Sequence, residues 1–216
     1  MQTTENCVAF GRVMGDLHTS GGLQESEIIL LKRLLPLIVA TIDDRSWRVR
    51  WTAAAKFADV ISNYDGLPGA MDSLVPAYEK LLQDPEAEVR TAATFNLAAV
   101  ARCTALVPAQ ANGRPSEQEV AEYQGPQVTV AERLVKRVTA LTEDDSEHVR
   151  AALAMVATEL APILGKDATI THLVPPVLLL LRDAASEVRL NLISSLGALN
   201  EVTRMDLLSQ ACCRQC

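Results

Sequence analysis

An aspartate and an arginine recur in this sequence at a fixed spacing, and their side chains are chemically complementary. The pattern D-x-x-x-x-V-R occurs four times, first at Asp44–Arg50. A carboxylate at a helix start accepts hydrogen bonds from backbone N–H groups, and a guanidinium forms paired hydrogen bonds with a carboxylate. The four copies therefore place eight groups that could pair with one another: Asp44, Arg50, Asp84, Arg90, Asp144, Arg150, Asp183 and Arg189.

Two kinds of chemistry fit these arginines. In a stack of repeated units, the arginine of one unit reaches the aspartate of a neighbour and the carbonyls of the turn, which forms a structural ladder. Alternatively, the arginines bind a phosphate group or the acidic face of a partner. The pair recurs in the same register in every complete unit. This regularity favours the structural ladder.

Two of these turns also carry side chains that are typical of protein interfaces. Trp47 is the only aromatic residue in the four turns, and it is flanked by arginines. Trp and Arg are enriched in interface hot spots, so Trp47 is either a core residue or an exposed anchor for a partner. Trp51 is expected to point elsewhere, between repeats. The candidate partner-binding residues are Arg45, Ser46, Trp47, Arg48, Pro85 and Glu86.

Other chemistry is not predicted. None of the three histidines has a second histidine or a carboxylate at metal-ligand spacing. The cysteine cluster at 212–216 lacks the second group of ligands that a metal-binding knuckle needs. We therefore interpret it as a chain terminus rather than a metal site. Gly165-Lys166-Asp167 lacks the other residues of a phosphate-binding loop, and no nucleophile motif is present. The sequence therefore predicts no catalytic residues, no metal and no cofactor.

The elements that position the aspartates and arginines are predicted from the repeat. The aspartates are separated by 40, 60 and 39 positions, and a period near 40 is typical of helical solenoids. Positions 4, 8 and 11 after the motif valine are mostly apolar, as on one face of a helix. Each unit is thus a first helix, a turn with the aspartate, and a second helix. A proline eight positions before the aspartate is expected to kink three first helices, and Lys136 replaces it in the third unit.

The fold class is all-α, an α-α superhelix with four full repeats and partial repeats at both ends. Residues 107–127 are polar, contain three prolines, and are predicted to be an inserted, protease-sensitive loop. Residues 1–18 are predicted to be the second helix of a partial repeat, and 205–216 the start of a truncated one. The full repeats are predicted at 26–62, 70–106, 128–164 and 169–201.

Composition limits the classes of partner and compartment. The net charge of −7 argues against a protein that tracks a nucleic-acid backbone, which needs a basic face. The longest apolar run has nine residues, far fewer than the roughly 20 needed to span a bilayer. Five scattered cysteines do not indicate a disulfide framework. We expect a cytoplasmic or nuclear protein that binds neither nucleic acid nor membrane.

The repeat pattern resembles that of HEAT repeats, and rarer strings narrow the resemblance. DRSWRVRWTAAAKF, LGKDATITHL and EVRLNLISSL are similar to middle repeats of the scaffold (A) subunit of protein phosphatase 2A. The resemblance covers most of the chain from about Leu35 to Gln210. The insert, Lys136 and the C-terminal string ACCRQC depart from the family pattern.

The resemblance implies a non-catalytic HEAT-repeat solenoid whose intra-repeat turns bind a regulatory (B-type) subunit. The catalytic subunit would bind to repeats missing from this chain. A second interpretation is a HEAT-repeat transport or adaptor protein that wraps a protein cargo. A third is a HEAT-like enzyme such as a base-excision glycosylase, which the low aromatic content and the acidic charge disfavour.

Overall fold

The computed structural model of the 216-residue chain describes residues 25–65, 67, 69–103, 106–108 and 127–203, without the side chains of 25–31, 106–108 and 127–128. The helix expected at 1–18, the interior of the insert and the segment 205–216 lie outside these residues. The chain divides into unit 1, residues 1–134, and unit 2, residues 135–216.

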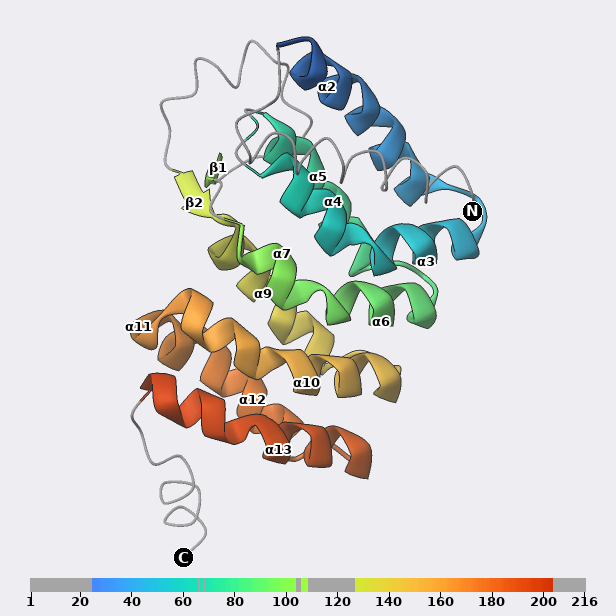
Figure 1. Ribbon diagram of the computed structural model, residues 1–216. Coiled ribbons are helices and arrows are strands. Elements are labelled where there is room, and N and C mark those ends of the chain that lie inside the picture. The colour runs from blue at the N-terminus through green and yellow to red at the C-terminus, as the bar shows by residue number, and fades with distance from the viewer. Residues whose placement is uncertain (1–24, 66, 68, 104–105, 109–126, 204–216) are drawn as a thin grey trace, which may run out of the picture. The chain divides into compact units, whose positions relative to one another are not determined.

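Unit 1 contains two helix–turn–helix repeats (Figure 1). Their second helices lie side by side, because α3 packs against α6 and α4 against α7. The first repeat consists of α2 (Glu25–Ala40), the 3₁₀ turn η1 (Thr41–Asp43), α3 (Trp47–Ala55) and α4 (Phe57–Tyr64). The second repeat consists of α5 (Ala70–Leu81), α6 (Ala87–Phe95) and α7 (Leu97–Ala101).

Unit 2 is built in the same way, and α9 (Val130–Thr142) crosses the boundary between the units. Its second helices α10 and α13 pack against each other, and α12 packs against both. The elements after α9 are α10 (Glu147–Leu164), α11 (Lys166–Ala168), the π-helical turn η2 (Thr169–Leu173), α12 (Val174–Leu180) and α13 (Ser186–Thr203).

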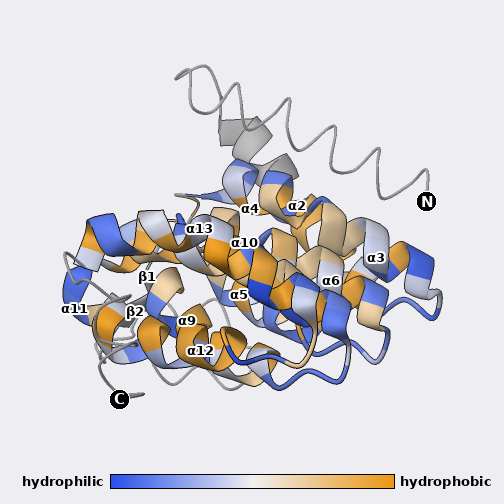
Figure 2. Ribbon diagram, turned by 90° about the horizontal axis from the view of Figure 1, so that it is seen from below, coloured by the Kyte–Doolittle hydropathy of each residue, from blue (hydrophilic) through white to orange (hydrophobic). Residues whose placement is uncertain are grey.

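The core of each unit is formed by the helix face that the sequence pattern predicts. Eleven of the twelve residues at positions 4, 8 and 11 after the four motif valines are buried, and Leu196 is half-buried. Between the helices of unit 1, the buried Tyr78 hydroxyl donates to the Ala93 carbonyl at 2.5 Å, and its ring lies 4.9 Å from that of Phe57. Figure 2 shows hydrophobic residues along α10 and α12 of unit 2. No described helix is long and apolar enough to cross a bilayer.

The second helices of unit 1 are interrupted, whereas the sequence predicted continuous helices. The breaks fall at Lys56 and at Asn96, each of which has a backbone ψ near zero. The Asn96 side chain explains how the breaks are tolerated, because its Nδ2 donates to the carbonyls of Ala54 at 2.9 Å and Ala92 at 3.1 Å. One carbonyl near the break at Lys56 and one near the break at Asn96 thereby accept a hydrogen bond from this side chain.

One short strand pairing, which the sequence did not predict, occurs at the base of the insert. β1 (Leu106–Pro108) pairs antiparallel with β2 (Gln127–Thr129), and β1 packs on α5. The next helix begins with a capping box, in which the Thr129 N–H donates to Glu132 at 2.8 Å and the Glu132 N–H donates to the Thr129 hydroxyl at 3.2 Å. Apart from this short ladder, the described chain is helices and turns, which confirms the all-α class.

The prolines that lie eight positions before the motif aspartates have two structural roles rather than one. Pro36 and Pro76 lie inside α2 and α5, as expected. Pro175 instead lies in the first turn of α12. The π-helical turn η2 precedes it, and the Val174 N–H donates to the Thr169 carbonyl across this wider turn.

Candidate functional site

The four aspartates fix the turn between the two helices of each repeat. Each carboxylate accepts a hydrogen bond from the N–H two residues later, at 2.7 to 2.9 Å. The second helix starts one residue after that N–H, for example at Ala87. Pro85 therefore lies before the N-cap residue Glu86 and outside the helix. Asp84 orders the turn and not the helix start itself.

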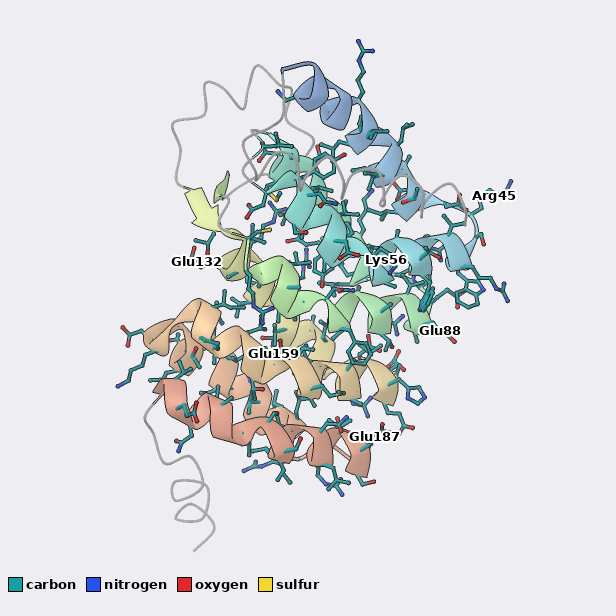
Figure 3. All side chains as sticks on the ribbon, viewed as in Figure 1. Arg45, Lys56, Glu88, Glu132, Glu159 and Glu187 are labelled. Carbon is teal, nitrogen blue, oxygen red and sulfur yellow. The ribbon has the colours of Figure 1, made fainter. Side chains whose placement is uncertain are left out.

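The first turn of three second helices carries a glutamate. Glu88 of α6, Glu147 of α10 and Glu187 of α13 occupy this place, and Figure 3 labels two of them. A negative charge there is favourable, because the helix N-terminus carries a partial positive charge. The first turn of α3 has no acidic residue and contains Arg48 instead. The α3 turn is therefore electrostatically different from the other three.

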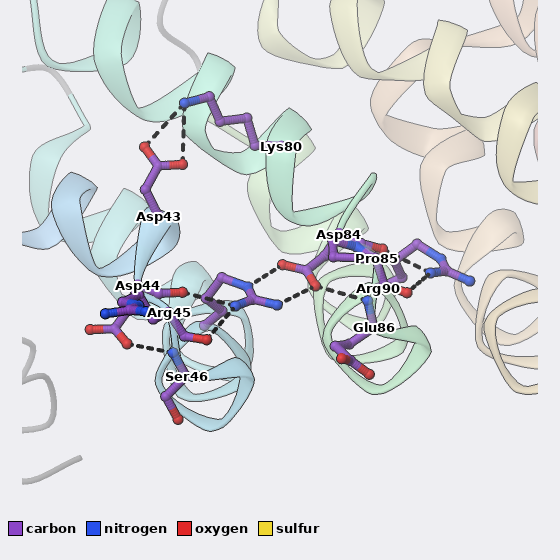
Figure 4. Close-up of polar contacts among 10 residues, drawn as sticks. Asp43, Asp44, Arg45, Ser46, Lys80, Asp84, Pro85, Glu86 and Arg90 are labelled. Carbon is purple, nitrogen blue, oxygen red and sulfur yellow. Dashed lines mark hydrogen bonds and ion pairs between the residues drawn. The ribbon is translucent and has the colours of Figure 1, made fainter.

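In unit 1, Arg50 links the two repeats through a two-pronged ion pair with Asp84, which is labelled in Figure 4. Its Nε and Nη2 atoms donate to the two carboxylate oxygens of Asp84, at 2.6 and 3.0 Å. Its Nη1 atom donates to the carbonyls of Asp44 at 2.8 Å and Arg45 at 3.4 Å. The side chains of Arg50 and Asp84 are only 13% and 5% exposed. One arginine thus holds its own turn and the turn of the next repeat.

Arg150 makes the equivalent contacts in unit 2. Its Nε and Nη2 atoms donate to Asp183 at 2.6 and 3.1 Å, and its Nη1 atom donates to the Asp144 carbonyl at 2.6 Å. Arg90 and Arg189 donate in the same way to the carbonyls of their own turns. Within each unit, the arginine-to-aspartate contact expected for a structural ladder is therefore present.

The electrostatics of these pairs follow from their geometry. The hydrogen bond to Asp84 raises the pKa of Arg50, and burial partly opposes this shift. The hydrogen bond from Arg150 lowers the pKa of Asp183, with a smaller contribution from the Ala185 N–H, while burial acts in the opposite direction. Both charged forms are therefore stabilised by their partners.

The candidate partner-binding side chains surround the turn between η1 and α3, and the next turn of unit 1. Arg45, Ser46 and Arg48 are exposed, as are Pro85 and Glu86 of the neighbouring turn. Figure 3 shows Arg45 projecting from its turn. Trp47, the first residue of α3, is half-buried, with the Arg48 guanidinium 4.6 Å from its ring centroid. This distance is within the range of a cation–π contact.

Trp51 was predicted to lie between repeats, and this prediction was wrong. Its side chain is 42% exposed, whereas the next three residues of α3 are buried. Small residues fill the core face of α3 because α6 packs closely there, and this leaves the indole ring on the outer side. The N-terminal half of α3 consequently presents two tryptophans and an arginine.

A groove of ≈ 350 Å³ lies between the two turns of unit 1. The Arg50–Asp84 pair forms part of it, and the exposed Lys80 and Asp43 side chains approach within 3.2 Å of each other beside it. The sequence analysis did not predict the Lys80–Asp43 contact, although both residues lie shortly before the aspartate of their turn. It also missed the partly buried ion pair of Arg133 with Glu79, at 2.9 Å, because the insert separates the two residues in the sequence.

The described residues offer no other reactive group with an evident role. Burial raises the pKa of the Cys103 thiol to about 12, so it remains protonated and is a poor nucleophile at neutral pH. No group of three or more His, Cys, Asp or Glu side chains suited to a metal ion occurs in the part of the chain that the structure describes.

Helix–turn–helix repeats joined by Asp–Arg pairs define an α-helical repeat architecture. Residues 70–165 match the family model described as PPP2R1A-like HEAT repeat. The chain is also similar to two curated proteins, each named as the beta isoform of the 65 kDa regulatory (A) subunit of serine/threonine-protein phosphatase 2A. It is 36% identical to the Homo sapiens protein over 132 residues, and 40% identical to the Mus musculus protein over 73 residues.

These matches are local in both chains. The first covers 61% of this chain and 19% of the human protein, and the second covers 34% of this chain and 12% of the mouse protein. The chain therefore spans a small part of the length of these relatives. The resemblance predicted from the repeat strings is confirmed: the chain carries HEAT repeats similar to those of the 65 kDa regulatory (A) subunit of phosphatase 2A.

Proposed function

We propose that this chain is part of a non-catalytic scaffold of a protein phosphatase 2A complex. Its intra-repeat turns would hold a regulatory (B-type) subunit near the catalytic subunit, which would bind to repeats outside this chain. The observation that carries the proposal is the 36% identity over 132 residues to a protein named as a regulatory subunit of this phosphatase.

The charge at the start of α3 supports a binding role for this turn. An arginine in the first turn of a helix is unfavourable by roughly 0.3–1 kcal/mol, because it meets the positive end of the helix dipole. The other three second helices of the described repeats have a glutamate there, so folding does not require Arg48. Arg45 and Arg48 are both exposed and form no ion pair with an acidic side chain among the described residues, and the Arg48 guanidinium lies over the Trp47 ring.

The test is direct binding between the purified chain and purified B-type regulatory subunits, with and without the catalytic subunit. Arg45→Glu/Arg48→Glu should abolish or strongly weaken binding. Lys32→Glu/Arg33→Glu is a matched control, because it reverses two exposed charges on α2 outside the turn. The proposal fails if no regulatory subunit binds, and the turn assignment fails if the two double variants bind equally well.

The role proposed here excludes catalysis by the chain itself. Both similar proteins are named as regulatory subunits, which supports this view. We expect no phosphatase, nuclease or nucleotide hydrolase activity with or without added divalent metal. A HEAT-repeat transport or adaptor role is not favoured, because no observation points to a transported cargo.

A further inference from the structure

Two aromatic side chains on the second helices of unit 1 are exposed to solvent. Trp51 of α3 is 42% exposed and Phe95 of α6 is 49% exposed. The rings of Phe57, Tyr64 and Tyr78, in contrast, are buried in the same unit. Aromatic residues are enriched in protein interfaces, and exposed apolar patches often mark them. The two exposed rings are therefore a candidate contact surface.

The hydrogen bonds of Asn96 show that the two rings belong to one surface. Its Nδ2 atom donates to the carbonyls of Ala54 at 2.9 Å and Ala55 at 3.4 Å, so the end of α6 lies beside the end of α3. Phe95 directly precedes Asn96, and Trp51 lies one helical turn before Ala55. Packed helix axes are about 8–10 Å apart and a helix rises about 1.5 Å per residue, which places the two aromatic residues roughly 11 Å apart.

Short side chains separate the two rings. Ala55 and Thr91 are half-buried, and each lies one turn away from the aromatic residue of its own helix. A partner that approaches this surface therefore meets two large rings with short side chains between them. We call these four residues, Trp51, Ala55, Thr91 and Phe95, the α3–α6 face.

The α3–α6 face is distinct from the surfaces through which the repeats stack. Ala54 lies on the stacking side of α3 and is completely buried, whereas Trp51 stays exposed although α3 packs against α6. In unit 2, Met155 has the register position of Phe95. It is 49% exposed although α10 packs against α13. A neighbouring repeat therefore does not cover these positions.

The charges on α3 favour an acidic partner for this face. Among α3, α6, α10 and α13, only α3 contains no aspartate or glutamate. Arg48 lies three residues before Trp51, which places both on one side of the helix, and the exposed Lys56 follows Ala55 directly. Neither basic side chain forms an ion pair with an acidic residue in the described part of the chain. In a chain with a net charge of −7, α3 is thus a locally basic helix.

One acidic side chain borders the face from the neighbouring helix. Glu88 is the counterpart of Arg48 in the repeat register and is exposed at the start of α6. Figure 3 labels both Glu88 and Lys56. An acidic partner would be attracted by the basic residues of α3 and repelled by this one glutamate. Removing the charge of Lys56 and removing that of Glu88 should therefore have opposite effects on binding.

We propose that the α3–α6 face binds an acidic amphipathic helix of a partner protein. Two apolar side chains seven residues apart in such a helix are separated by about 10.5 Å along its axis, which matches the spacing of Trp51 and Phe95. Acidic residues beside them would meet Arg48 and Lys56. The proposal is independent of the proposed scaffold function, because the four residues of the face lie outside the candidate binding turns.

Peptide binding followed by tryptophan fluorescence tests the proposal. Trp47→Phe leaves Trp51 as the only tryptophan of the chain, so the emission reports contact with the α3–α6 face. The probe is a synthetic helical peptide with two leucines seven residues apart and glutamates beside them. One comparison peptide has lysine in place of every glutamate, and another has its leucines on opposite sides of the helix. The glutamate peptide should shift the emission to shorter wavelength and bind about tenfold more tightly than either comparison peptide.

Substitutions in the full chain show which residues carry the binding, with the affinity for the glutamate peptide measured by calorimetry. Trp51→Ala and Phe95→Ala should each weaken binding by roughly tenfold or more. Met155→Ala is the matched control for Phe95→Ala, because the two residues are equally exposed at the same register position, and it should leave binding unchanged. Lys56→Gln should weaken binding and Glu88→Gln should strengthen it. Circular dichroism should show unchanged helicity, because all five side chains are exposed.

Several results would overturn the proposal. One is the absence of binding of the glutamate peptide up to millimolar concentration, and another is equal or tighter binding of the lysine peptide. Equal losses of affinity from Phe95→Ala and Met155→Ala would also contradict it. Sedimentation equilibrium of the chain alone provides a further check. A dimer that Trp51→Ala dissociates would show that a second copy of the chain, and not an acidic helix, occupies the face.

Discussion

At the scale of single residues, the repeats are joined by arginines with several acceptors each. Arg50 and Arg150 each bind both oxygens of the next aspartate and the carbonyls of their own turn. Only a planar guanidinium has donors in the fork that this arrangement needs. A lysine at either position would keep the charge but lose the paired geometry.

Arg50→Ala should destabilise the chain by about 3 kcal/mol or more, because it leaves the carboxylate of Asp84 buried without its partner. The free energy of unfolding, measured with urea, gives the change. Lys80→Ala provides the control, because the Lys80–Asp43 pair is more than 60% exposed at both side chains and should contribute less than about 1 kcal/mol. Equal effects of the two substitutions would contradict the structural role of Arg50.

The Arg150–Asp183 pair should make stability depend on pH in a predictable direction. The lowered pKa of Asp183 means that the folded carboxyl binds fewer protons than the unfolded one, whose pKa is about 4. Its stabilising contribution is complete above the unfolded pKa and is lost as pH falls through the folded pKa. The Tm difference between wild type and Arg150→Met should therefore shrink in acid. A difference that stays constant down to the lowest pH at which the chain is folded would be evidence against this linkage.

The proposed binding turn can be tested by comparing the same substitution at Trp47 and at Trp51. Trp47→Ala should leave the Tm nearly unchanged, because the ring is only half-buried, and should weaken regulatory-subunit binding by roughly 2 kcal/mol or more. Trp51→Ala removes the same side chain one helical turn away and should weaken binding much less. Melting and binding are measured on the same preparations. A large fall in the Tm of Trp47→Ala would assign this residue to the core instead.

At the scale of helices and turns, the sequence predicted the features that depend on local periodicity. The buried columns of the second helices and the positions of the Asp–Arg turns follow from the repeat alone. The breaks at Lys56 and Asn96 could not be predicted in this way, because the Asn96 amide reaches carbonyls that lie about 40 residues away in the sequence. The β1–β2 pairing was missed for a similar reason, since it joins two segments across the insert. The exposure of Trp51 depends on the close packing of α3 against α6, which one sequence does not reveal.

Asn96→Ala should destabilise unit 1 by about 1–2 kcal/mol, because it removes the donor to carbonyls of two helices. Asn191 is the matched control. It also reaches the second helix of the preceding repeat, but its contact to the Ala151 carbonyl is 3.5 Å long. Asn191→Ala should therefore cost less than about 1 kcal/mol in urea unfolding. If Asn191→Ala lowers the free energy of unfolding more than Asn96→Ala does, the hydrogen bonds of the Asn96 side chain are not what stabilises α3 and α6.

At the scale of the whole molecule, the described contacts join neighbouring repeats within each unit. α3 packs on α6 and α10 on α13, and each packing is accompanied by one Arg-to-Asp pair. In such a protein, stability is approximately a sum of repeat terms and nearest-neighbour terms. A substitution in one pair should then open the chain locally rather than everywhere.

Arg150→Ala tests this expectation through the pattern of amide hydrogen exchange. The substitution removes the two hydrogen bonds to Asp183 and the bond to the Asp144 carbonyl, all within unit 2. Protection should fall most in α10 and α13, because opening these helices no longer requires breaking the pair. The amides of α3 and α6 should retain most of their protection, and Arg50→Ala should produce the reverse pattern. If both variants reduce protection equally along the whole chain, the molecule unfolds as one cooperative body and the nearest-neighbour account fails.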